Sequence, residues 1–466
     1  MIIWSMSMRK YAHIFKLIKI ILFVSVVFPQ NYIVKTSDGF EAGFDSISAI
    51  TPFLESVLVS EHTWGDYYKL SQLNKRNSTE TIYNHFHENL HIDSIFIFPQ
   101  ENIQNNVLVN FFFPLKKAQS MKEIHSSLNM ITQGYHFIEP ETDVLIGRYS
   151  EKKLLAYVSP KFHFKNNFSG FVGVANEGET RTISGELQFH FENLWHTAEI
   201  IDIQLKRWKE LSEKLLLSVQ EPLLFHFPFG AKLEYRYEVN EGLYVKTQSS
   251  LGVLSRGHEI GNWEFTGLNT NVEPTESGME KGLHFLKEHS LRVTHSIYLR
   301  KRKWQPKQGL NAHTMISVGK LSIMNGSHTS GELNSLTEFV HLLAPNTGIK
   351  NKIEFKGKWN SSDSLEWSQM IRYGGLENLR GYREDQFFGD WVLLPSIEFF
   401  RYVTAETIIS IFSGGAIQKK YHPYPWNYGV SLEQQYSNNH ISISFAWGRK
   451  DSFSQGKVHI KYVNIL

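Results

Sequence analysis

The chain of 466 residues contains no cysteine, which excludes disulfide scaffolds, thiolate nucleophiles, cysteine-bound zinc and iron–sulfur clusters. Proline is scarce, with 14 residues, whereas Phe, Tyr and Trp make up 14% of the chain, a balance that favours β-strands. Neither sign of charge dominates: 48 Lys+Arg against 46 Asp+Glu give a formal net charge of +2, so composition does not indicate a nucleic-acid partner. Beyond the N-terminus there is no run of 18 apolar residues, which excludes a helical membrane protein. A membrane β-barrel stays open, because its lipid-facing residues alternate with polar ones.

Residues 1–30 have the pattern of an export signal. Basic residues such as Arg9, Lys10 and Lys19 precede a nine-residue apolar core, Ile20–Phe28. That core is too short to span a bilayer but has the length of a signal-peptide core. An uncleaved anchor, or a start at Met8, is the alternative. The pattern predicts that the mature chain leaves the cytoplasm.

Residues 53–117 are predicted to form a small α+β domain. The expected elements are a strand at 53–60, helices at 67–73 and 79–90, and strands at 92–98 and 107–113. Residues 118–164 are predicted to be a connecting segment with some strand character.

Residues 165–466 consist of short segments in which apolar and polar residues alternate. In one of them Leu233 and Tyr235 alternate with Glu234 and Arg236, and about sixteen such segments follow one another up to the last residue. The polar faces are heavily charged, which suits a watery lumen better than a soluble sandwich or solenoid, the alternatives. Tryptophans recur at strand ends, where a membrane-interface girdle would lie: Trp263, Trp359, Trp391, Trp426 and Trp447. The predicted fold is therefore an all-β transmembrane barrel of about 16 antiparallel strands, preceded by the small α+β domain.

One segment, 365–390, interrupts the alternation and is rich in glycine and charge. It lies between predicted strands at 353–359 and 391–402, and five strands can be counted after it. If the C-terminus is periplasmic, this parity places the segment on the extracellular side. Long interruptions of this kind are commonly functional.

Within that segment, Leu379-Arg380-Gly381-Tyr382 resembles the loop motif of the BamA/TamA/FhaC superfamily, the bacterial surface antigen family. Gly374-Gly375 before the motif and Glu398 in the next strand fit the same pattern. Ser218–Pro222 is similar to a strand end of that family's barrel, and 53–117 is similar to one of its POTRA domains. The resemblance implies a periplasmic POTRA-like domain followed by a sixteen-stranded outer-membrane barrel.

The resemblance also implies site residues. In that family the loop folds into the lumen and its arginine pairs with an acidic residue of the barrel wall. Here the strand that usually offers an aspartate contains Phe412–Gly415 instead, so Glu398 is the expected partner of Arg380. Gly381 would permit the tight turn and Tyr382 would anchor it by packing.

The implied function is transport and not catalysis, with no cofactor and no metal. Unfolded β-rich client polypeptides would be assembled into, or secreted across, the outer membrane of a diderm bacterium. Outer-membrane lipid would surround the barrel, and periplasmic chaperones or accessory lipoproteins are further partners that the resemblance allows. A client would add a strand to the predicted edge carrying Val107, Val109 and Phe111. Opening between the first and last barrel strands would expose a second edge.

Three other interpretations compete with transport. His87-Glu88-Asn89-Leu90-His91 is a literal zinc-protease pattern, but strands are predicted directly after it, and a solvated helix face explains it equally. A barrel hydrolase would need a nucleophile motif, and none stands out. A passive outer-membrane porin is the strongest rival, because charged lumen faces suit diffusion.

Overall fold

The computed structural model describes residues 32–36, 41–44, 46–50, 52–53, 66–75, 78–87, 90–150, 153–177, 180–209, 211–224, 227, 229–255, 261–299, 308–324, 326–362, 364–436 and 439–465. The predicted export signal at 1–30 and almost all of the predicted strand at 53–60 lie outside these residues. The chain divides into two compact units. One contains the chain up to Ser94 with Lys116–Ile124 and Gly147–Leu155, and the other contains Ile95–Leu115, His125–Ile146 and Ala156–Leu466.

The first described part is a four-stranded sheet in the order β2-β1-β4-β3. Its elements are β1 (Tyr32–Thr36), β2 (Glu41–Phe44), the short helix η1 (Ile47–Ala49), β3 (Asp66–Lys75) and β4 (Ser78–His87). The helices predicted at 67–73 and 79–90 are therefore wrong. Thr, Ile, Tyr and Phe are frequent in 79–86, and these residues favour the paired β3–β4 ladder over a helix.

The described residues of the zinc-protease pattern, 87 and 90–91, are not helical. His87 is the last residue of β4, and His91 is the first residue of β5 (His91–Ile97). The zinc-protease pattern requires its two histidines one turn apart on the same face of a single helix, whereas here they belong to two different strands. The pattern therefore does not form the geometry that a metalloprotease requires.

A β-α-α-β-β unit begins at His91. After β5 come α3 (Asn105–Phe112), η2 (Phe113–Lys117), α4 (Met121–Gly134), β6 (Asp143–Ser150) and β7 (Lys153–Ser159), with the strands in the order β5-β7-β6. A mixed α/β region that resembles a POTRA domain therefore precedes the barrel. The elements of this unit lie within 91–159, and the domain bounds 53–117 and the connection at 118–164 stay predictions.

The predicted strand at 107–113 is helix α3 in the structure. Its buried residues are Val107, Leu108, Phe111 and Phe112, two pairs spaced four apart, which is the pattern of one helix face. The Phe111 ring packs on Tyr135 at 4.7 Å between ring centroids. The predicted client edge of Val107, Val109 and Phe111 is therefore wrong, because a helix offers no unpaired strand backbone.

Among the described residues, the structure contains no helix with the length and apolar character needed to cross a membrane.

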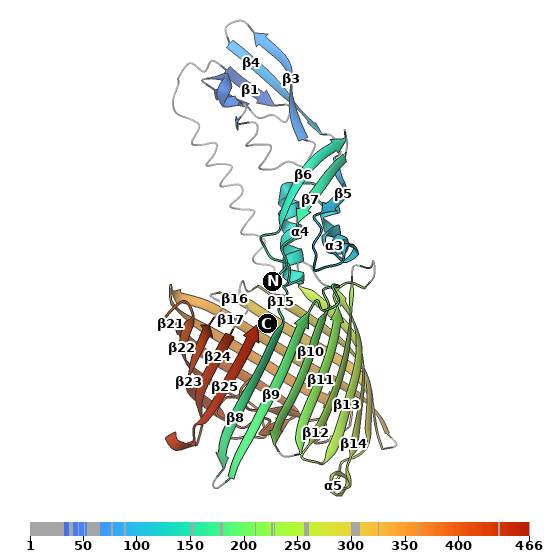
Figure 1. The fold of residues 1–466 in the computed structure, drawn as a ribbon, viewed down its shortest axis with the longest axis vertical. Helices are drawn as coiled ribbons and strands as arrows, with labels where there is room; N and C mark the ends of the chain where they lie inside the picture. Colours follow the sequence, from blue (N-terminus) through green and yellow to red (C-terminus); the bar gives the residue numbers. More distant parts are fainter. Residues whose placement is uncertain are drawn as a thin grey trace. The chain divides into compact units, whose positions relative to one another are not determined.

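The remainder of the described chain is a closed antiparallel barrel of 16 strands, which confirms the predicted fold class (Figure 1). The strands are β8 (Asn167–Glu177), β9 (Thr180–Glu192), β10 (Ile200–Lys209), β11 (Ser212–Glu221), β12 (Gly230–Asn240), β13 (Tyr244–Ser255), β14 (Asn262–Pro274), β15 (Leu286–Tyr298), β16 (Gly309–Ile323), β17 (Gly326–Ala344), β18 (Thr347–Asn360), β21 (Trp391–Tyr402), β22 (Thr407–Gly415), β23 (Trp426–Tyr436), β24 (Asn439–Gly448) and β25 (Lys457–Ile465). β25 closes the ring by pairing with β8, from Ile465 opposite Asn167 to Val458 opposite Val174. We call the end of the barrel with Asn167 and Ile465 the terminal end, and the opposite end the loop end.

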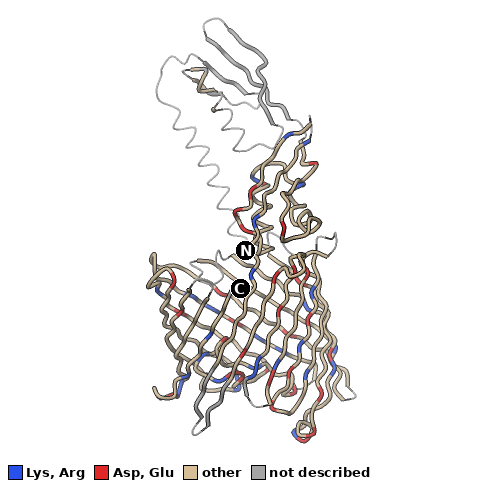
Figure 2. Tube along the Cα trace, viewed as in Figure 1, with Lys and Arg blue, Asp and Glu red and all other residues tan. Residues whose placement is uncertain are grey.

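The two faces of the barrel wall have opposite chemistry. Leu233 and Leu251 are 58% and 62% exposed on the outside. Inside, Arg236 Nε lies 2.7 Å from Glu234 Oε1. Figure 2 shows positive and negative residues recurring along the barrel strands. An apolar exterior around a charged interior is the arrangement of a barrel surrounded by lipid.

The tryptophans singled out in the sequence lie at strand ends, as predicted. Four of them are at the loop end: Trp391 begins β21, Trp426 begins β23, and Trp359 and Trp447 are each next to the last residue of β18 and β24. Trp263 lies at the terminal end, near the start of β14. These positions are where interfacial aromatic girdles occur.

The outward apolar band generates the first testable prediction. Leu251→Arg puts a cation on the lipid face of β13 and should cost about 2–4 kcal/mol of barrel stability, because the guanidinium must leave water. The check is the folded fraction after insertion into lipid vesicles, read by heat-modifiable migration on gels. Ser250→Arg is the matched control, since Ser250 directly precedes Leu251 and lies opposite Glu234 on the inner face. Equal losses in both variants would contradict the assignment of the faces.

Candidate functional site

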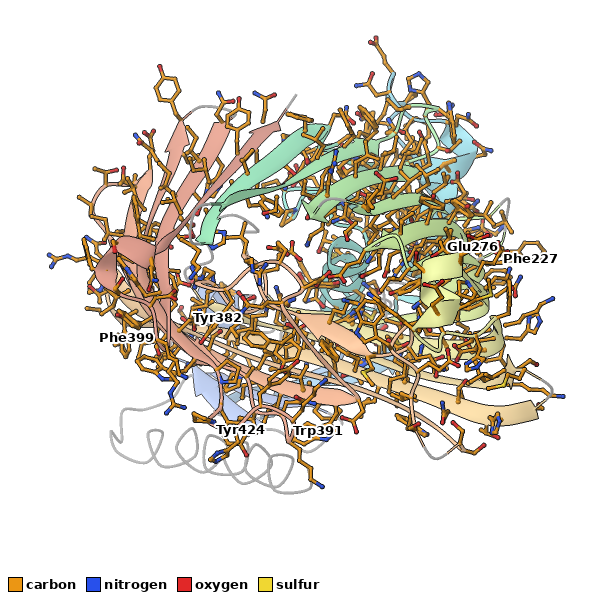
Figure 3. The ribbon with its side chains drawn as sticks, turned by 90° about the horizontal axis from the view of Figure 1, so that it is seen from below. Phe227, Glu276, Tyr382, Trp391, Phe399 and Tyr424 are labelled. Atoms are coloured by element: carbon orange, nitrogen blue, oxygen red, sulfur yellow. The ribbon has the colours of Figure 1, made fainter. Side chains whose placement is uncertain are left out.

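The segment between β18 and β21 folds into a structured loop, residues 364–390, which we call the Arg380 loop. Within it, β19 (Ile371–Tyr373) pairs with β20 (Phe387–Gly389). Five barrel strands follow the loop, as counted from the sequence. In the view along the barrel, Tyr382 lies inside the ring of strands, whereas Phe399 lies on its outside (Figure 3).

Arg380 and Glu398 form an ion pair at the inner wall, the pairing that the sequence predicted. Arg380 Nη2 donates to Glu398 Oε2 at 2.9 Å, and Ser410 Oγ donates to Glu398 Oε1 at 2.7 Å. Lys350 Nζ lies 3.7 Å from the same Oε2. On its other side, the Arg380 guanidinium lies over the Phe412 ring, 3.3 Å from the ring centroid.

These contacts explain how a charged pair is tolerated there. Glu398 is 7% exposed, so its carboxylate depends on protein donors in place of water. The Arg380 guanidinium adds a charge-assisted hydrogen bond, and its flat face gains a cation–π contact with Phe412. The sequence marked Phe412–Gly415 only as a departure from the family pattern. The structure shows that Phe412 supplies a contact to Arg380 of a different kind.

Gly381 and Tyr382 hold the loop against β23 and β24. Gly381 has φ +87, and a Cβ atom there would come within 2.7 Å of the Trp447 carbonyl carbon, so only glycine fits without a shift. The Tyr382 hydroxyl donates to the Trp426 carbonyl oxygen at 3.0 Å and accepts from the Arg449 N–H at 3.0 Å. The anchoring predicted for Tyr382 is therefore made by hydrogen bonds as well as by packing.

Leu379 contributes the apolar part of the docking. It is 1% exposed and belongs to a buried cluster with Tyr373, Val392, Leu394 and Ala416. Two of these residues come from β21 and one from the loop's own hairpin, so burial of Leu379 fixes the loop to the wall beside Arg380.

The Arg380 loop also reaches strands on the other side of the β25–β8 closure. Glu384 Oε2 lies 2.8 Å from Lys206 Nζ on β10, and Lys206 Nζ lies 3.6 Å from Glu186 Oε2 on β9. Glu384 Oε1 accepts the Leu376 N–H at 2.7 Å, which braces the carboxylate within the loop. The loop therefore contacts β21–β24 and β10 directly and is linked to β9 through Lys206, so it joins strands on both sides of the closing pair. Sequence reasoning missed Glu384 and Lys206, because they are 178 positions apart and no local motif links them.

The remaining predicted positions lie elsewhere. Glu221 ends β11 at the terminal end, and its Oε2 accepts from Thr197 Oγ1 at 2.9 Å, so Ser218–Pro222 is a strand end as expected. In the sheet β5-β7-β6, the outer strands are β5 and β6, and helix α3 contributes none of its strands.

Comparison with known proteins supports the architecture. No protein-family model matches the chain, and no curated protein matches it. Among solved structures, BamA from Haemophilus ducreyi lacking POTRA domains 1–3 is 13% identical with a TM-score of 0.53, covering 92% of this chain and 95% of that chain. CdiB from Acinetobacter baumannii is 12% identical with a TM-score of 0.58, covering 92% and 83%. CdiB from Escherichia coli is 10% identical with a TM-score of 0.57, covering 96% and 93%. The chain therefore has the fold of BamA and CdiB, a sixteen-stranded barrel after a POTRA-like region.

The shared carboxylate generates an asymmetric prediction. Arg380→Ala leaves Glu398 with Lys350 and Ser410, whereas Glu398→Ala leaves two cations without their carboxylate. Losing a hydrogen bond between charged groups costs about 1.5–3 kcal/mol, so Arg380→Ala should speed amide hydrogen exchange in 374–384 by about tenfold or more. Glu398→Ala should have the larger effect, because it leaves Arg380 and Lys350 side by side without the carboxylate that offsets both charges.

The control for this pair is Glu234→Ala. It breaks an inner-wall pair with Arg236, outside the Arg380 loop, and should leave loop exchange unchanged. A larger effect of Arg380→Ala than of Glu398→Ala would show that the carboxylate is not the centre of the site.

Gly381 generates a second prediction. Gly381→Ala should displace the loop from β24 and open it to trypsin at Arg380 or Arg383, because the new Cβ meets backbone atoms of Trp447. Gly282→Ala is a matched control: its φ is +80, but nothing lies within 4 Å of an added Cβ. Both variants carry the left-handed cost of about 1–2 kcal/mol, and only the first should become cleavable there. Cleavage at Arg380 or Arg383 in both variants would mean that general destabilisation, and not the close contact of Gly381 with Trp447, exposes the loop.

Proposed function

We propose that this protein assembles β-rich polypeptides into the outer membrane, or moves them across it, through a barrel whose closing strands separate. The single observation that carries the proposal is the Arg380 loop, which contacts the inner wall on both sides of the β25–β8 pair, at β21 through Arg380–Glu398 and at β10 through Glu384–Lys206. BamA, a membrane-protein assembly factor, and CdiB, a translocation protein, have the same fold.

Lipid contact is supported by the outer face of the barrel. Exposed apolar side chains recur on neighbouring strands, among them Leu251, Leu291 and Val318, in paired register through β13–β16. A soluble protein rarely leaves such a continuous apolar band in water. We place the barrel in the outer membrane of a diderm bacterium, with the POTRA-like region in the periplasm.

Client insertion would use the closing strands. A closed ring leaves no free strand edge, so a client can pair with the barrel only if β25 and β8 separate. Each would then expose a row of backbone N–H and C=O groups to an incoming strand. The contacts of the Arg380 loop to the flanking strands would keep the rest of the wall in place during that opening.

Client capture would take place at a sheet edge of the POTRA-like region. Helix α3 is not available for this role, so we assign it to the outer strand β6. Leu145 and Tyr149 on β6 are 70% and 50% exposed, which provides apolar contact for an added strand. Backbone pairing gives affinity in this mode, and the alternate side chains give selectivity.

A passive porin is the rival, and the Arg380 loop speaks against it. Diffusion needs an open lumen, whereas this loop crosses between opposite parts of the inner wall and is fixed there by ion pairs and a buried leucine. In a barrel that transports a polypeptide, such a loop would hold the wall strands in place while the closing strands separate.

The experiment compares the outer-membrane and secreted proteomes of a deletion strain complemented with the wild type or with Ser169→Cys/Val463→Cys. Ser169 and Val463 are opposite residues of β8 and β25, and the chain has no other cysteine. A disulfide there should lock the ring and reproduce the deletion proteome, and reductant should restore the wild-type proteome. Loss of several barrels would indicate assembly, and loss of one secreted protein would indicate dedicated secretion.

The matched control is Thr314→Cys/Ser335→Cys, which crosslinks β16 to β17. Their hydroxyl oxygens are 3.2 Å apart, so a disulfide can form without opening the ring elsewhere. This variant should behave as wild type. Unchanged proteomes in the deletion strain would overturn the transport proposal in favour of a passive barrel, and normal transport by the β8–β25 crosslink would overturn the opening of the ring.

A further inference from the structure

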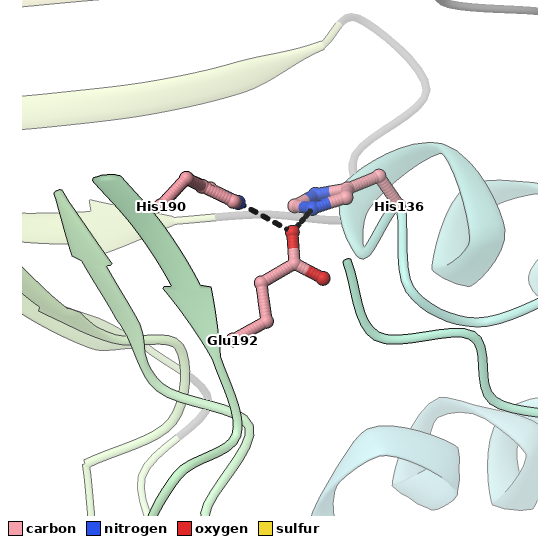
Figure 4. A group of neighbouring side chains, drawn as sticks. All are labelled: His136, His190 and Glu192. Atoms are coloured by element: carbon pink, nitrogen blue, oxygen red, sulfur yellow. Dashed lines mark hydrogen bonds and ion pairs between the residues drawn. The ribbon is translucent and has the colours of Figure 1, made fainter. Parts of the chain in front are cut away.

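Three side chains that are distant in sequence converge beside the terminal end of the barrel. His136 follows helix α4, and His190 and Glu192 are close to the end of β9 (Figure 4). His136 Nε2 lies 2.6 Å and His190 Nε2 lies 2.8 Å from the same Glu192 Oε1. The three candidate ligand atoms all lie within 4.8 Å of one another.

Outer contacts orient two of these groups. His190 Nδ1 lies 2.6 Å from Asp202 Oδ1 on β10, so Nδ1 carries the hydrogen and Nε2 faces the centre of the cluster. Glu192 Oε2 accepts the Lys165 N–H at 2.7 Å, which leaves Oε1 for the two imidazoles. A metal-binding histidine commonly donates its other ring N–H to a carboxylate, and this hydrogen bond fixes the orientation of the ring.

The charge of the cluster suits a cation. The Glu192 side chain is 1% exposed, and it receives both imidazoles on one oxygen. Without a metal, each Nε2 must donate a proton to that oxygen, and His190, which also donates from Nδ1, must then be a cation. A divalent ion would displace one proton, from His190 Nε2, while neutral His136 would carry its hydrogen on Nδ1, and the Nδ1–H bond of His190 to Asp202 would be kept.

We propose that His136, His190 and Glu192 bind a divalent transition-metal ion, with zinc as the preferred ion. Two imidazoles and one carboxylate are common zinc ligands, at about 2.0–2.2 Å from the ion. Tetrahedral ligands at that distance lie about 3.4 Å apart, so the present contacts must open by less than 1 Å. The His136 side chain is 43% exposed and is the ligand with room to move, and its open side leaves the fourth position to water.

The ion would crosslink His136 to barrel strand β9. Hydrogen bonds already join neighbouring segments: Asn193 Nδ2 donates to the Asn102 carbonyl oxygen at 2.6 Å, and the Gln104 N–H donates to the His196 carbonyl oxygen at 2.9 Å. Metal binding would make that attachment stronger and dependent on zinc. The inference is independent of the transport proposal, and it differs from the sequence expectation of no metal.

The test uses untagged full-length protein in detergent, treated with chelator and then titrated with Zn²⁺ in a calorimeter. We expect one equivalent to bind, and binding to be lost in His136→Gln and His190→Gln. Asp202→Asn should weaken binding about 10- to 100-fold, because it removes only the support of His190. Lower pH should weaken binding as well, because the metal displaces protons.

His284→Gln is the matched control. His284 Nδ1 lies 2.7 Å from Glu366 Oε1, a comparable histidine–carboxylate pair outside the cluster, and this variant should bind zinc normally. Co²⁺ added to the wild type should give the visible absorption of a tetrahedral site, a readout that needs no variant. Absence of a cobalt spectrum, or equal zinc binding by wild type and His136→Gln/His190→Gln, would overturn the proposal and leave a hydrogen-bonded cluster only.

Discussion

Closure of the strand ladder between β25 and β8 is the constraint on which the rest of the structure depends. It satisfies the backbone of all sixteen barrel strands and removes every free edge from the ring. In a closed ring, alternate residues of every strand face the outside and the inside of the barrel. Residues such as Leu233 face outward, and residues such as Glu234 face a confined interior. The charged interior then needs internal partners, and the pairing of charges inside the barrel follows from closure.

The Arg380 loop uses this confined interior. Burying the Glu398 carboxylate without hydrogen-bond donors would destabilise the barrel. Ordering the loop costs conformational entropy, which contacts with the inner wall must offset. Docking solves both problems, because Arg380 neutralises Glu398 while Leu379 buries apolar surface in the same step. Gly381 decides how closely the loop can approach, since its missing Cβ is what lets the chain lie against Trp447.

The sequence predicted the barrel because a repeated alternation is a local signal that tertiary contacts rarely override. It also predicted the Arg380–Glu398 contact, since the family pattern named the loop and parity placed it. It failed at α3, where a run of Val, Leu and Phe fits a buried strand and one helix face equally well. Glu384–Lys206 and His136–Glu192 were beyond its reach for another reason. In each pair the two residues belong to different elements, 178 and 56 positions apart, and no spacing along the chain encodes that meeting.

The two groups of contacts that sequence could not predict lie on the same pair of strands. Lys206 on β10 is held by the Arg380 loop, and His190 and Glu192 on β9 are held by His136. On the far side of the closing pair, β21, β23 and β24 are held through Glu398, Trp426 and Trp447. The tethered strands thus flank β25 and β8 on both sides. The proposed separation of β25 from β8 would therefore take place between tethered strands, and Lys206 links the Arg380 loop to β8 as well, because its Nζ lies 5.8 Å from the centroid of the Phe171 ring.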